Sequence, residues 1–156
     1  MKILKNLEPI VSGLSASIMI GILAILSFET STGYWLMISF GATSLIVFVF
    51  HDKEFAQPNN IFFGHLLGIT VGIVFNELMG MSSISLALAV GLTITLMMYL
   101  KVVHPPAAAN PLIALFADVS IDYIIFPVIT GTIVIILVAY IINKFILKRN
   151  YPNKWF

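Results

Sequence analysis

One proline-rich stretch holds the residues best placed to do chemistry in this chain. It lies between long apolar segments and reads His104-Pro105-Pro106-Ala107-Ala108-Ala109-Asn110-Pro111. Prolines remove backbone donors and disfavour helix in the residue before them, so the chain must leave one helix here and start another. Within hydrocarbon such a break is tolerated only where protein or a water-lined cavity surrounds it. The stretch is therefore a candidate part of a permeation site.

A second short apolar segment carries a related pattern. Gly41-Ala42-Thr43-Ser44-Leu45-Ile46-Val47 and Ala108-Ala109-Asn110-Pro111-Leu112-Ile113-Ala114 both read as two small residues, a polar residue and then a Leu-Ile run. Each is the middle member of a three-segment half, 10–79 or 84–147. Three crossings per half would invert one half relative to the other, which is a common plan for secondary transporters. The pattern predicts two inverted repeats, and chance similarity is the alternative.

The two short segments together predict an anion site. If each is partly extended and then helical from about Thr43 and Asn110, two helix N-termini meet near the membrane midplane from opposite sides. Each N-terminus offers unpaired N–H groups and about half a positive charge, which suits a small anion. The alternative is that the hydroxyls bond back to helix carbonyls and Asn110 is a cap. The candidate binding residues are Gly41, Ala42, Thr43, Ser44, Ala108, Ala109 and Asn110.

Two histidines and a lysine are candidates for a gate or a proton-linked group. His104 follows Lys101 by about one turn, and His65 lies one turn into the third apolar segment. A histidine titrates near neutral pH, and a polar residue inside a membrane is a functional hypothesis by default. The alternatives are a packing or capping role for His104 and a bond from His65 to a neighbouring helix. A structural role in ordering loops and capping helices is expected for Pro105, Pro106, Gln57, Pro58, Asn59 and Asn60.

The composition places the chain in a lipid bilayer. Of 156 residues, 60% are hydrophobic and 10% are charged, whereas soluble domains carry roughly 25% charged residues. The mean hydropathy is +1.05. A net charge of +1 and the lack of basic runs do not indicate a nucleic-acid partner. Cysteine is absent, so thiolate metal sites and disulfides are excluded, and no cofactor is expected.

Six apolar segments predict an all-α polytopic protein with one transmembrane domain over residues 1–156. They run at about 10–28, 34–50, 61–79, 84–102, 105–117 and 123–147. A spanning helix needs about 20 residues, so 34–50 and 105–117 are short or broken. The first segment stays as a span because no A-x-A-type cleavage site follows it. Glycines at four-residue spacing, Gly64, Gly68 and Gly72, predict close helix packing within or between subunits.

The distribution of charge predicts the topology. If all six segments cross, every one of the eight Lys and Arg residues lies on one side, together with both termini. If the two short segments re-enter, the split falls to six against two. The positive-inside rule favours six crossings with cytoplasmic termini, in a plasma (inner) membrane. The last basic and aromatic residues, among them Arg149, Tyr151 and Trp155, are expected to anchor the chain at the interface.

Four blocks of sequence resemble the HPP family of small integral membrane proteins, named for the motif matched here by His104-Pro105-Pro106. The other blocks are Ser39-Phe40-Gly41-Ala42-Thr43-Ser44, Phe55-Ala56-Gln57-Pro58-Asn59-Asn60 with Gly64-His65, and Tyr151-Pro152-Asn153-Lys154-Trp155. Members in cyanobacteria and chloroplasts are described as nitrite transporters, so the resemblance implies carriage of nitrite or a similar small anion. The family is usually described with four spans, unlike the six expected here. This chain has Asn110-Pro111 where the family tends to have a hydroxyl residue and Ala.

Two other functions compete with anion transport. An intramembrane metal enzyme would need His51, His65 and His104 to converge, with an acid such as Asp52. The close ligand spacing and the nucleophile motifs of such enzymes are missing, so we expect neither an enzyme nor a metal site. A structural or regulatory membrane subunit explains the small size but not two matched breaks. Because six short segments leave little room for an enclosed site, a homo-oligomer, most simply a dimer, is also expected.

Overall fold

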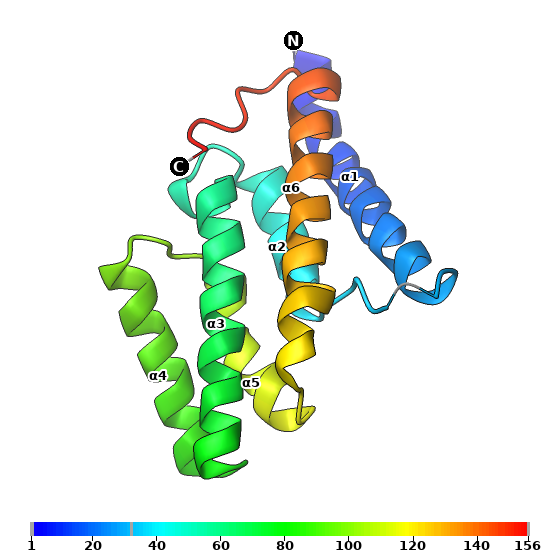
Figure 1. The fold of residues 1–156 in the computed structure, drawn as a ribbon. Coiled ribbons are helices and arrows are strands. Elements are labelled where there is room, and N and C mark those ends of the chain that lie inside the picture. The colour runs from blue at the N-terminus through cyan, green and yellow to red at the C-terminus, as the bar shows by residue number, and fades with distance from the viewer. Residues whose placement is uncertain (1, 32, 156) are drawn as a thin grey trace.

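The computed structural model describes residues 2–31 and 33–155, with side chains from Leu7 onward. The described part contains helices and no strands, as predicted (Figure 1). Short 3-10 turns at Glu54–Ala56, Pro105–Ala109 and Ile121–Ile124 join them, and π-helical turns at Ile125–Ile129 and Ile142–Ile146 extend the last helix at both ends. The helices are α1 (Lys2–Phe28), α2 (Ser39–Val49), α3 (Pro58–Met79), α4 (Ser83–Tyr99), α5 (Asn110–Phe116) and α6 (Thr130–Ile141).

Three helical stretches of the described chain are long and apolar enough to cross a membrane. They are Leu7–Phe28, Pro58–Met79 and Ile121–Ile146. The sequence predicted a fourth long segment over 84–102, but α4 ends at Tyr99 because the chain turns at Lys101, where φ is +57°. The two segments predicted to be short are short, with 11 residues in α2 and 7 in α5.

Helix ends follow local sequence signals where a suitable side chain is free to cap. Ser82 caps α4, and its hydroxyl and that of Ser85 form a reciprocal capping box. Gly80 ends α3 with φ +62°, a conformation that glycine adopts without strain. The prediction that Asn59 or Asn60 caps α3 was wrong. Pro58 is the first residue of that helix, a position that suits proline. The Asn60 amide instead donates to the Val103 carbonyl at 3.0 Å.

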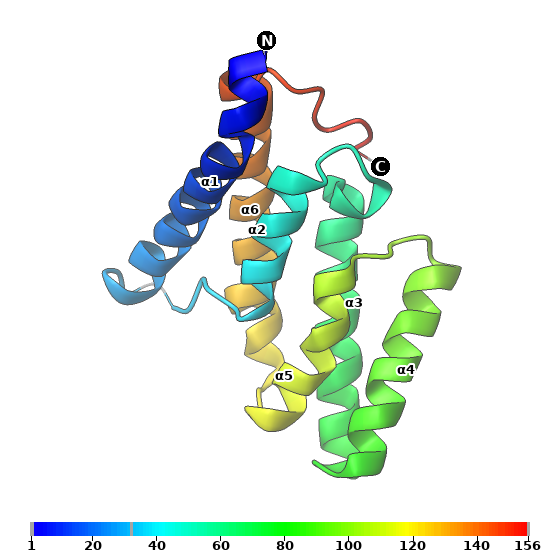
Figure 2. The ribbon, with the colours of Figure 1, turned by 180° about the vertical axis from the view of Figure 1, so that it is seen from behind.

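The two short helices lie together on one side of the bundle. In Figure 2, α2 and α5 are in front of α6 and α3, and they are flanked by α1 and α4. α3 packs against α4, α5 and α6, while α1 packs against α2 and α6. The long helices thus form a frame that holds both helix breaks next to each other.

Glycines on the long helices allow this close approach. A Cβ added at Gly64 would lie 2.8 Å from the Cβ of His104, and one at Gly68 would collide with the Ala107 carbonyl oxygen. A Cβ added at Gly72 would likewise collide with α5. On α6, Gly131 lies against the Phe40 ring of α2 and against the carbonyl of Trp35, four residues before α2 begins. The predicted small-residue faces therefore pack helices within the subunit on α3, whereas a Cβ at Gly13 or Gly91 would meet nothing within 4 Å.

The two ends of the bundle differ in charge. Lys101, Lys154 and the α2–α3 loop around Asp52 line one small cavity of about 250 Å³, so basic segments from three parts of the chain gather there. At the opposite end, the Asn76 amide donates to the Asp118 carboxylate at 2.6 Å, and Glu77 lines the same depression. The six-crossing topology predicts this separation of the loops, and the crossings themselves stay a prediction. We call the first end the basic end.

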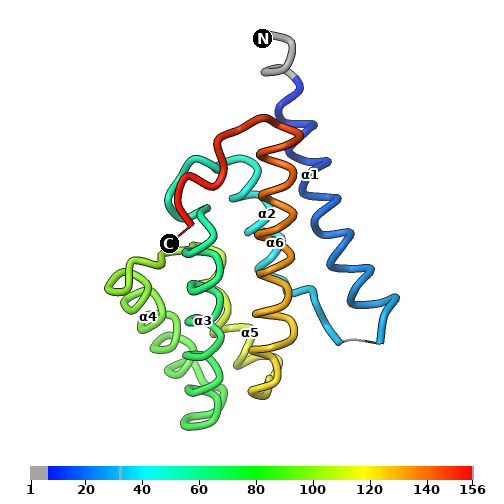
Figure 3. Tube along the Cα trace, turned by 45° about the horizontal axis from the view of Figure 1, so that its top comes forward, coloured from blue at the N-terminus to red at the C-terminus, as the bar shows by residue number. Residues whose placement is uncertain are grey.

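The C-terminal segment crosses the basic end as a strap, defined as residues 147–155 (Figure 3). The Tyr151 hydroxyl donates to the Ala56 carbonyl at 3.0 Å, and the Asn153 backbone N–H donates to the Gln57 side-chain oxygen at 2.8 Å. Tyr151 is 2% exposed, so the prediction that it anchors the chain at the interface was wrong. Burial raises the pKa of its hydroxyl. Trp155 is 45% exposed.

Candidate functional site

A cluster of polar side chains lies buried where the two helix breaks meet. Its members are Ser39 and Thr43 from α2, His65 from α3, His104 from the start of the 3-10 turn and Asn110 from α5. Ser39 is 5% exposed and the other four are 0% exposed. We call these five residues the polar cluster. Buried polar groups need hydrogen-bond partners, and every member finds them inside the cluster or on nearby backbone.

The Thr43 hydroxyl lies between the two imidazole rings. Its oxygen is 2.9 Å from Nε2 of His65 and 3.0 Å from Nε2 of His104. The ring centroids of the two histidines are 4.9 Å apart. The hydroxyl also lies 3.2 Å from the Ser39 carbonyl, one helical turn back. The expected helix carbonyl is therefore within hydrogen-bond distance, and it competes with the histidines for the single proton of the hydroxyl.

Asn110 joins the two short helices. Its side-chain oxygen accepts from the Ser39 hydroxyl at 2.9 Å, and its amide nitrogen donates to Nδ1 and to the backbone carbonyl of His65, both at 3.0 Å. Asn110 is the first residue of α5 but does not cap it with its side chain. The position that the sequence marked as a cap or a ligand thus connects α2, α3 and α5.

The first residues of α2 and α5 meet at this bond, as the prediction of two facing helix N-termini required. Two details differ from the prediction. α2 begins at Ser39, four residues before Thr43, because Met37 and Ile38 already form the first helical hydrogen bonds. The meeting point is at the level of His65, about 10 Å along α3 at 1.5 Å per residue. It therefore lies about 5 Å from the middle of α3, on the side of the basic end.

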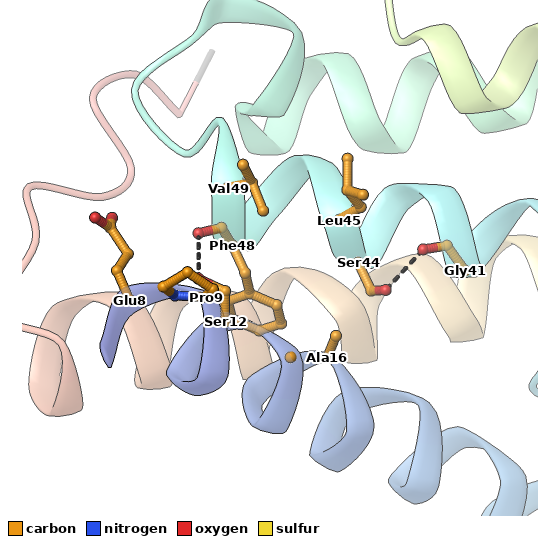
Figure 4. Close-up of a pocket in the computed structure, with 10 residues that line it drawn as sticks. Glu8, Pro9, Ser12, Ala16, Gly41, Ser44, Leu45, Phe48 and Val49 are labelled. Atoms are coloured by element: carbon orange, nitrogen blue, oxygen red, sulfur yellow. Dashed lines mark hydrogen bonds between the residues drawn. The ribbon is translucent and has the colours of Figure 1, made fainter. Parts of the chain in front are cut away.

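The other binding candidates lie outside the polar cluster. Gly41, Ala42 and Ala109 are exposed, and Ala108 is half-buried. Ser44 bonds back to the Gly41 carbonyl at 2.7 Å. Gly41 and Ser44 line a crevice of about 700 Å³ between α1 and α2, which is bordered by apolar and small side chains with Glu8 at one end (Figure 4).

A second groove runs along the surface of the helix breaks. It has a volume of about 490 Å³ and is lined by Ser39 and Ala42 from α2 and by Pro105, Pro106 and Ala109 from the other break, with apolar side chains of α5. Ser39 belongs both to this groove and to the polar cluster. The groove therefore reaches the polar cluster at Ser39.

The remaining candidates lie at the basic end of the bundle. Lys101 is exposed and has no described contact with the polar cluster, although it is near His104 in sequence. Gln57 donates to the carbonyls of His51 and Lys53 and so orders the loop, as the structural alternative expected. Sequence reasoning missed the carbonyl of Phe55, which lies 2.7 Å from Nδ1 of His104. The Phe55-Ala56-Gln57 block could have suggested it, but backbone partners leave no trace in side-chain patterns.

Three histidines do not assemble into a metal site. In the described part of the chain, no three His, Cys, Asp or Glu side chains are grouped closely enough to hold a metal ion. His51 lies in the loop after α2, apart from His65 and His104. Burial first, and then the positive charge of Arg149, lower its pKa. Only His65 and His104 come together.

The fold and the site define a helical integral membrane protein whose two broken helices meet at a buried polar cluster. The chain belongs to the HPP transmembrane family, which matches residues 2–152 under the description "HPP, transmembrane region". Two transmembrane proteins of Dictyostelium discoideum are each 33% identical to it, over 155 and 125 residues. These matches cover 92% and 75% of this chain, but 50% and 44% of the relatives. The chain thus spans about half the length of the relatives. No solved structure matches.

Proposed function

We propose that this protein carries a small inorganic monovalent anion, with nitrite as the first candidate, across the plasma (inner) membrane. The observation that supports this proposal most is the polar cluster, in which two imidazoles, two hydroxyls and a carboxamide are buried together. Polar groups inside a membrane protein are expensive and mark ion or substrate pathways. The anion would pass between the start of α2 and the start of α5, near Thr43 and Asn110.

Two inverted repeats would explain why the site lies between the halves. Thr43 and Asn110 are equivalent in the proposed repeat, and they bond opposite ring nitrogens of the same residue, His65. Glycines of the third helix in each half, Gly68 and Gly131, receive the break of the other half. The glycine relation is expected from a pseudo-twofold axis through the meeting point of α2 and α5. We propose this symmetry as the basis of alternating access.

Access to the site requires a rearrangement. Because Thr43, His65 and His104 are 0% exposed, an ion reaches them only if the elements around them move, and we propose that α2 and the break before α5 separate. The groove beside Ser39 is the natural place for that opening. The hydrogen bonds between α2 and this break run through two side-chain pairs, Ser39 with Asn110 and Thr43 with His104, so the separation breaks few contacts.

A flux assay tests the proposal. Purified protein is reconstituted into vesicles, and uptake of nitrite, nitrate, formate and chloride is compared with protein-free vesicles. We expect saturable uptake of at least one anion and its loss in Thr43→Val, which removes the hydroxyl between the rings. Thr95→Val is the matched control, because Thr95 is an exposed helical threonine that bonds only to the Gly91 carbonyl. Uptake equal to that of protein-free vesicles for all four anions contradicts the proposal.

A structural or regulatory subunit is the second candidate. The completeness of the hydrogen bonding in the polar cluster favours it, because a fully satisfied network also rigidifies a fold. Such a subunit conducts nothing in the flux assay. This candidate also predicts that Thr43→Val lowers the free energy of unfolding, and that flux is absent in the parent and in the variant alike.

We also propose that two copies associate through the side that carries α2 and α5. Broken backbone in hydrocarbon has to be covered by protein or water, and Pro105, Ala109 and Ala42 are exposed on this side of the single chain. A second copy would cover the groove and leave the basic ends of both copies in the cytoplasm. Disulfide trapping tests this proposal: Ala109→Cys should cross-link in native membranes and Leu137→Cys on α6 should not.

A further inference from the structure

The hydrogen bonds of His104 determine which of its ring nitrogens carries the proton. Nδ1 lies 2.7 Å from the Phe55 carbonyl oxygen. A carbonyl oxygen only accepts, so Nδ1 is the protonated nitrogen. A neutral imidazole carries one N–H group, which leaves Nε2 as a lone-pair acceptor that points at the Thr43 hydroxyl.

His65 has the opposite arrangement. The amide nitrogen of Asn110 only donates, and it lies 3.0 Å from Nδ1 of His65. The orientation of this amide follows from its other contacts, because its nitrogen also reaches a carbonyl and its oxygen receives the Ser39 hydroxyl. Nδ1 of His65 is therefore the acceptor, and Nε2 carries the proton that points at Thr43.

The space between the rings thus presents one donor and one acceptor. The Thr43 hydroxyl matches it, since its oxygen accepts from Nε2 of His65 and its one proton has the lone pair of His104 at 3.0 Å as a nearer acceptor than the Ser39 carbonyl at 3.2 Å. A monovalent anion such as nitrite has no proton to donate. An anion oxygen in the place of this hydroxyl would face the lone pair of His104, which repels it. One proton on Nε2 of His104 converts that acceptor into a second donor and supplies the charge that neutralises the anion.

We propose that His104 takes up one proton with each anion, so that the protein carries the anion and the proton together as an electroneutral pair. This proposal rests on the transport function proposed above. A proton from water on the loading side forms the Nε2–H bond, and on the release side the bond breaks and the proton returns to water with the anion. The histidine is unchanged after a cycle, and no oxidant or reductant takes part.

Few other charges compete with this proton. The titratable side chain in ring contact with His104 is His65 on α3, held neutral by Asn110. On the segment of His104 itself, Lys101 is exposed. The loop that carries Phe55 has His51, Asp52, Lys53 and Glu54, of which the last three are exposed and Asp52 pairs with Lys53 at 3.1 Å. On α2 and α5, the side chains of the cluster members Ser39, Thr43 and Asn110 neither take up nor release a proton near neutral pH.

Proton and anion movements measured in the same vesicles test the proposal. The protein is reconstituted with a pH-sensitive dye in the lumen, and a nitrite or nitrate gradient is imposed with the membrane potential set by potassium and valinomycin. Protein-free vesicles correct for nitrous acid that crosses the lipid unaided. We expect lumenal acidification with about one proton per anion and an initial rate that does not change with the imposed potential.

Variants of the histidines identify the group that takes the proton. His104→Gln keeps hydrogen-bonding atoms but cannot be protonated, so we expect it to lose uptake at least tenfold or to carry the anion without a proton. His51→Gln, in the loop at the basic end, is the matched control and should keep the parent ratio. Nitrogen NMR of the ring nitrogens in the parent protein should show the proton of neutral His104 on Nδ1 and that of His65 on Nε2.

Three outcomes are decisive. Parent protein that takes up an anion with charge movement and without a proton overturns proton coupling and leaves the transport function standing. His104→Gln that keeps the parent proton-to-anion ratio shows that another group takes the proton, and it overturns the assignment to His104. Parent protein that takes up none of the anions removes the transport function, and proton coupling with it. The proton-to-anion ratio of the parent protein decides whether transport is proton-coupled, even if His104→Gln fails to fold.

Discussion

The two helix breaks bring different chemistry to the same place. The break before α2 supplies two hydroxyls, from Ser39 and Thr43, each of which can donate and accept and can rotate to suit its partner. The break before α5 supplies an imidazole and a carboxamide, and each of these has its donor and acceptor atoms at fixed positions. The α5 side therefore sets the direction of the hydrogen bonds, and the α2 side adapts to it.

The two breaks also differ in how tightly they are held. The segment from His104 to α5 lies along Gly64, Gly68 and Gly72, which occupy three successive turns of α3. The start of α2 lies against the one glycine of α6, Gly131. If access needs one side to move, α2 is the side with fewer close contacts to a long helix.

The largest effect should come from replacing the carboxamide on the α5 side. Asn110→Leu removes the partner of Nδ1 of His65 and of the Ser39 hydroxyl, and it leaves both groups buried. Each unsatisfied buried group costs about 1–3 kcal/mol, so we expect the free energy of unfolding to fall by about 2–4 kcal/mol. Thermal or denaturant unfolding in detergent measures it. A loss below that of Ser39→Ala would reverse the proposed ranking of the two sides.

The glycine contacts come next. Gly68→Ala places a methyl group against the Ala107 carbonyl, and Gly131→Ala places one against Phe40 and Trp35. Overpacking of this kind costs about 1–3 kcal/mol, and more than the helix propensity of alanine returns. Gly91→Ala is the control, because its Cβ would meet open space and the variant should be neutral or slightly stabilised. If Gly131→Ala alone is tolerated, the α2 side is the looser one.

A smaller effect is expected for the hydroxyl on the α2 side. Ser39→Ala takes away the donor to the Asn110 side-chain oxygen, which keeps its amide bonds to His65. We expect a loss of about 1 kcal/mol, typical of one net hydrogen bond. Ser39→Thr, which retains the hydroxyl, should restore part of it. A loss larger than that of Asn110→Leu would show that the hydroxyl side carries the network.

The smallest effect should be at the strap. Tyr151→Phe removes the bond to the Ala56 carbonyl next to Phe55 but keeps the buried ring, so the free energy of unfolding should drop by about 0.5–1 kcal/mol. Tyr140→Phe on α6 is the matched control, because that hydroxyl contacts only the exposed Lys144 amine. Equal losses in both variants would mean that the strap adds no support to the loop that holds His104.

Much of the architecture could be predicted from the residues. Prolines at 105, 106 and 111 and the short apolar segments predicted both breaks, because proline cannot continue a helix and a short segment cannot span the bilayer. The family resemblance carried by the His-Pro-Pro and Gln57-Pro58-Asn59-Asn60 blocks is confirmed by the match over residues 2–152. The gathering of basic loops at one end followed from counting charges along alternating segments.

The site itself was predicted only in part. Thr43, His65, His104 and Asn110 were all candidates, but they were assigned to separate roles, the first and last to binding and the histidines to a gate. The neighbours of Thr43 in sequence, Gly41 and Ala42, were expected beside it and lie at the surface instead. A helix turns successive residues by about 100°, so only one face of a short motif can reach a common point.

The residues alone were enough to predict local features: where helices break, which helices approach closely and which ends carry charge. These depend on residue type and on neighbours within a few positions. The packing of distant segments places one threonine hydroxyl between two imidazoles and brings the Phe55 carbonyl to His104. Those contacts join residues 22 to 61 positions apart, and a backbone carbonyl is present at every residue, so its role is decided by packing alone.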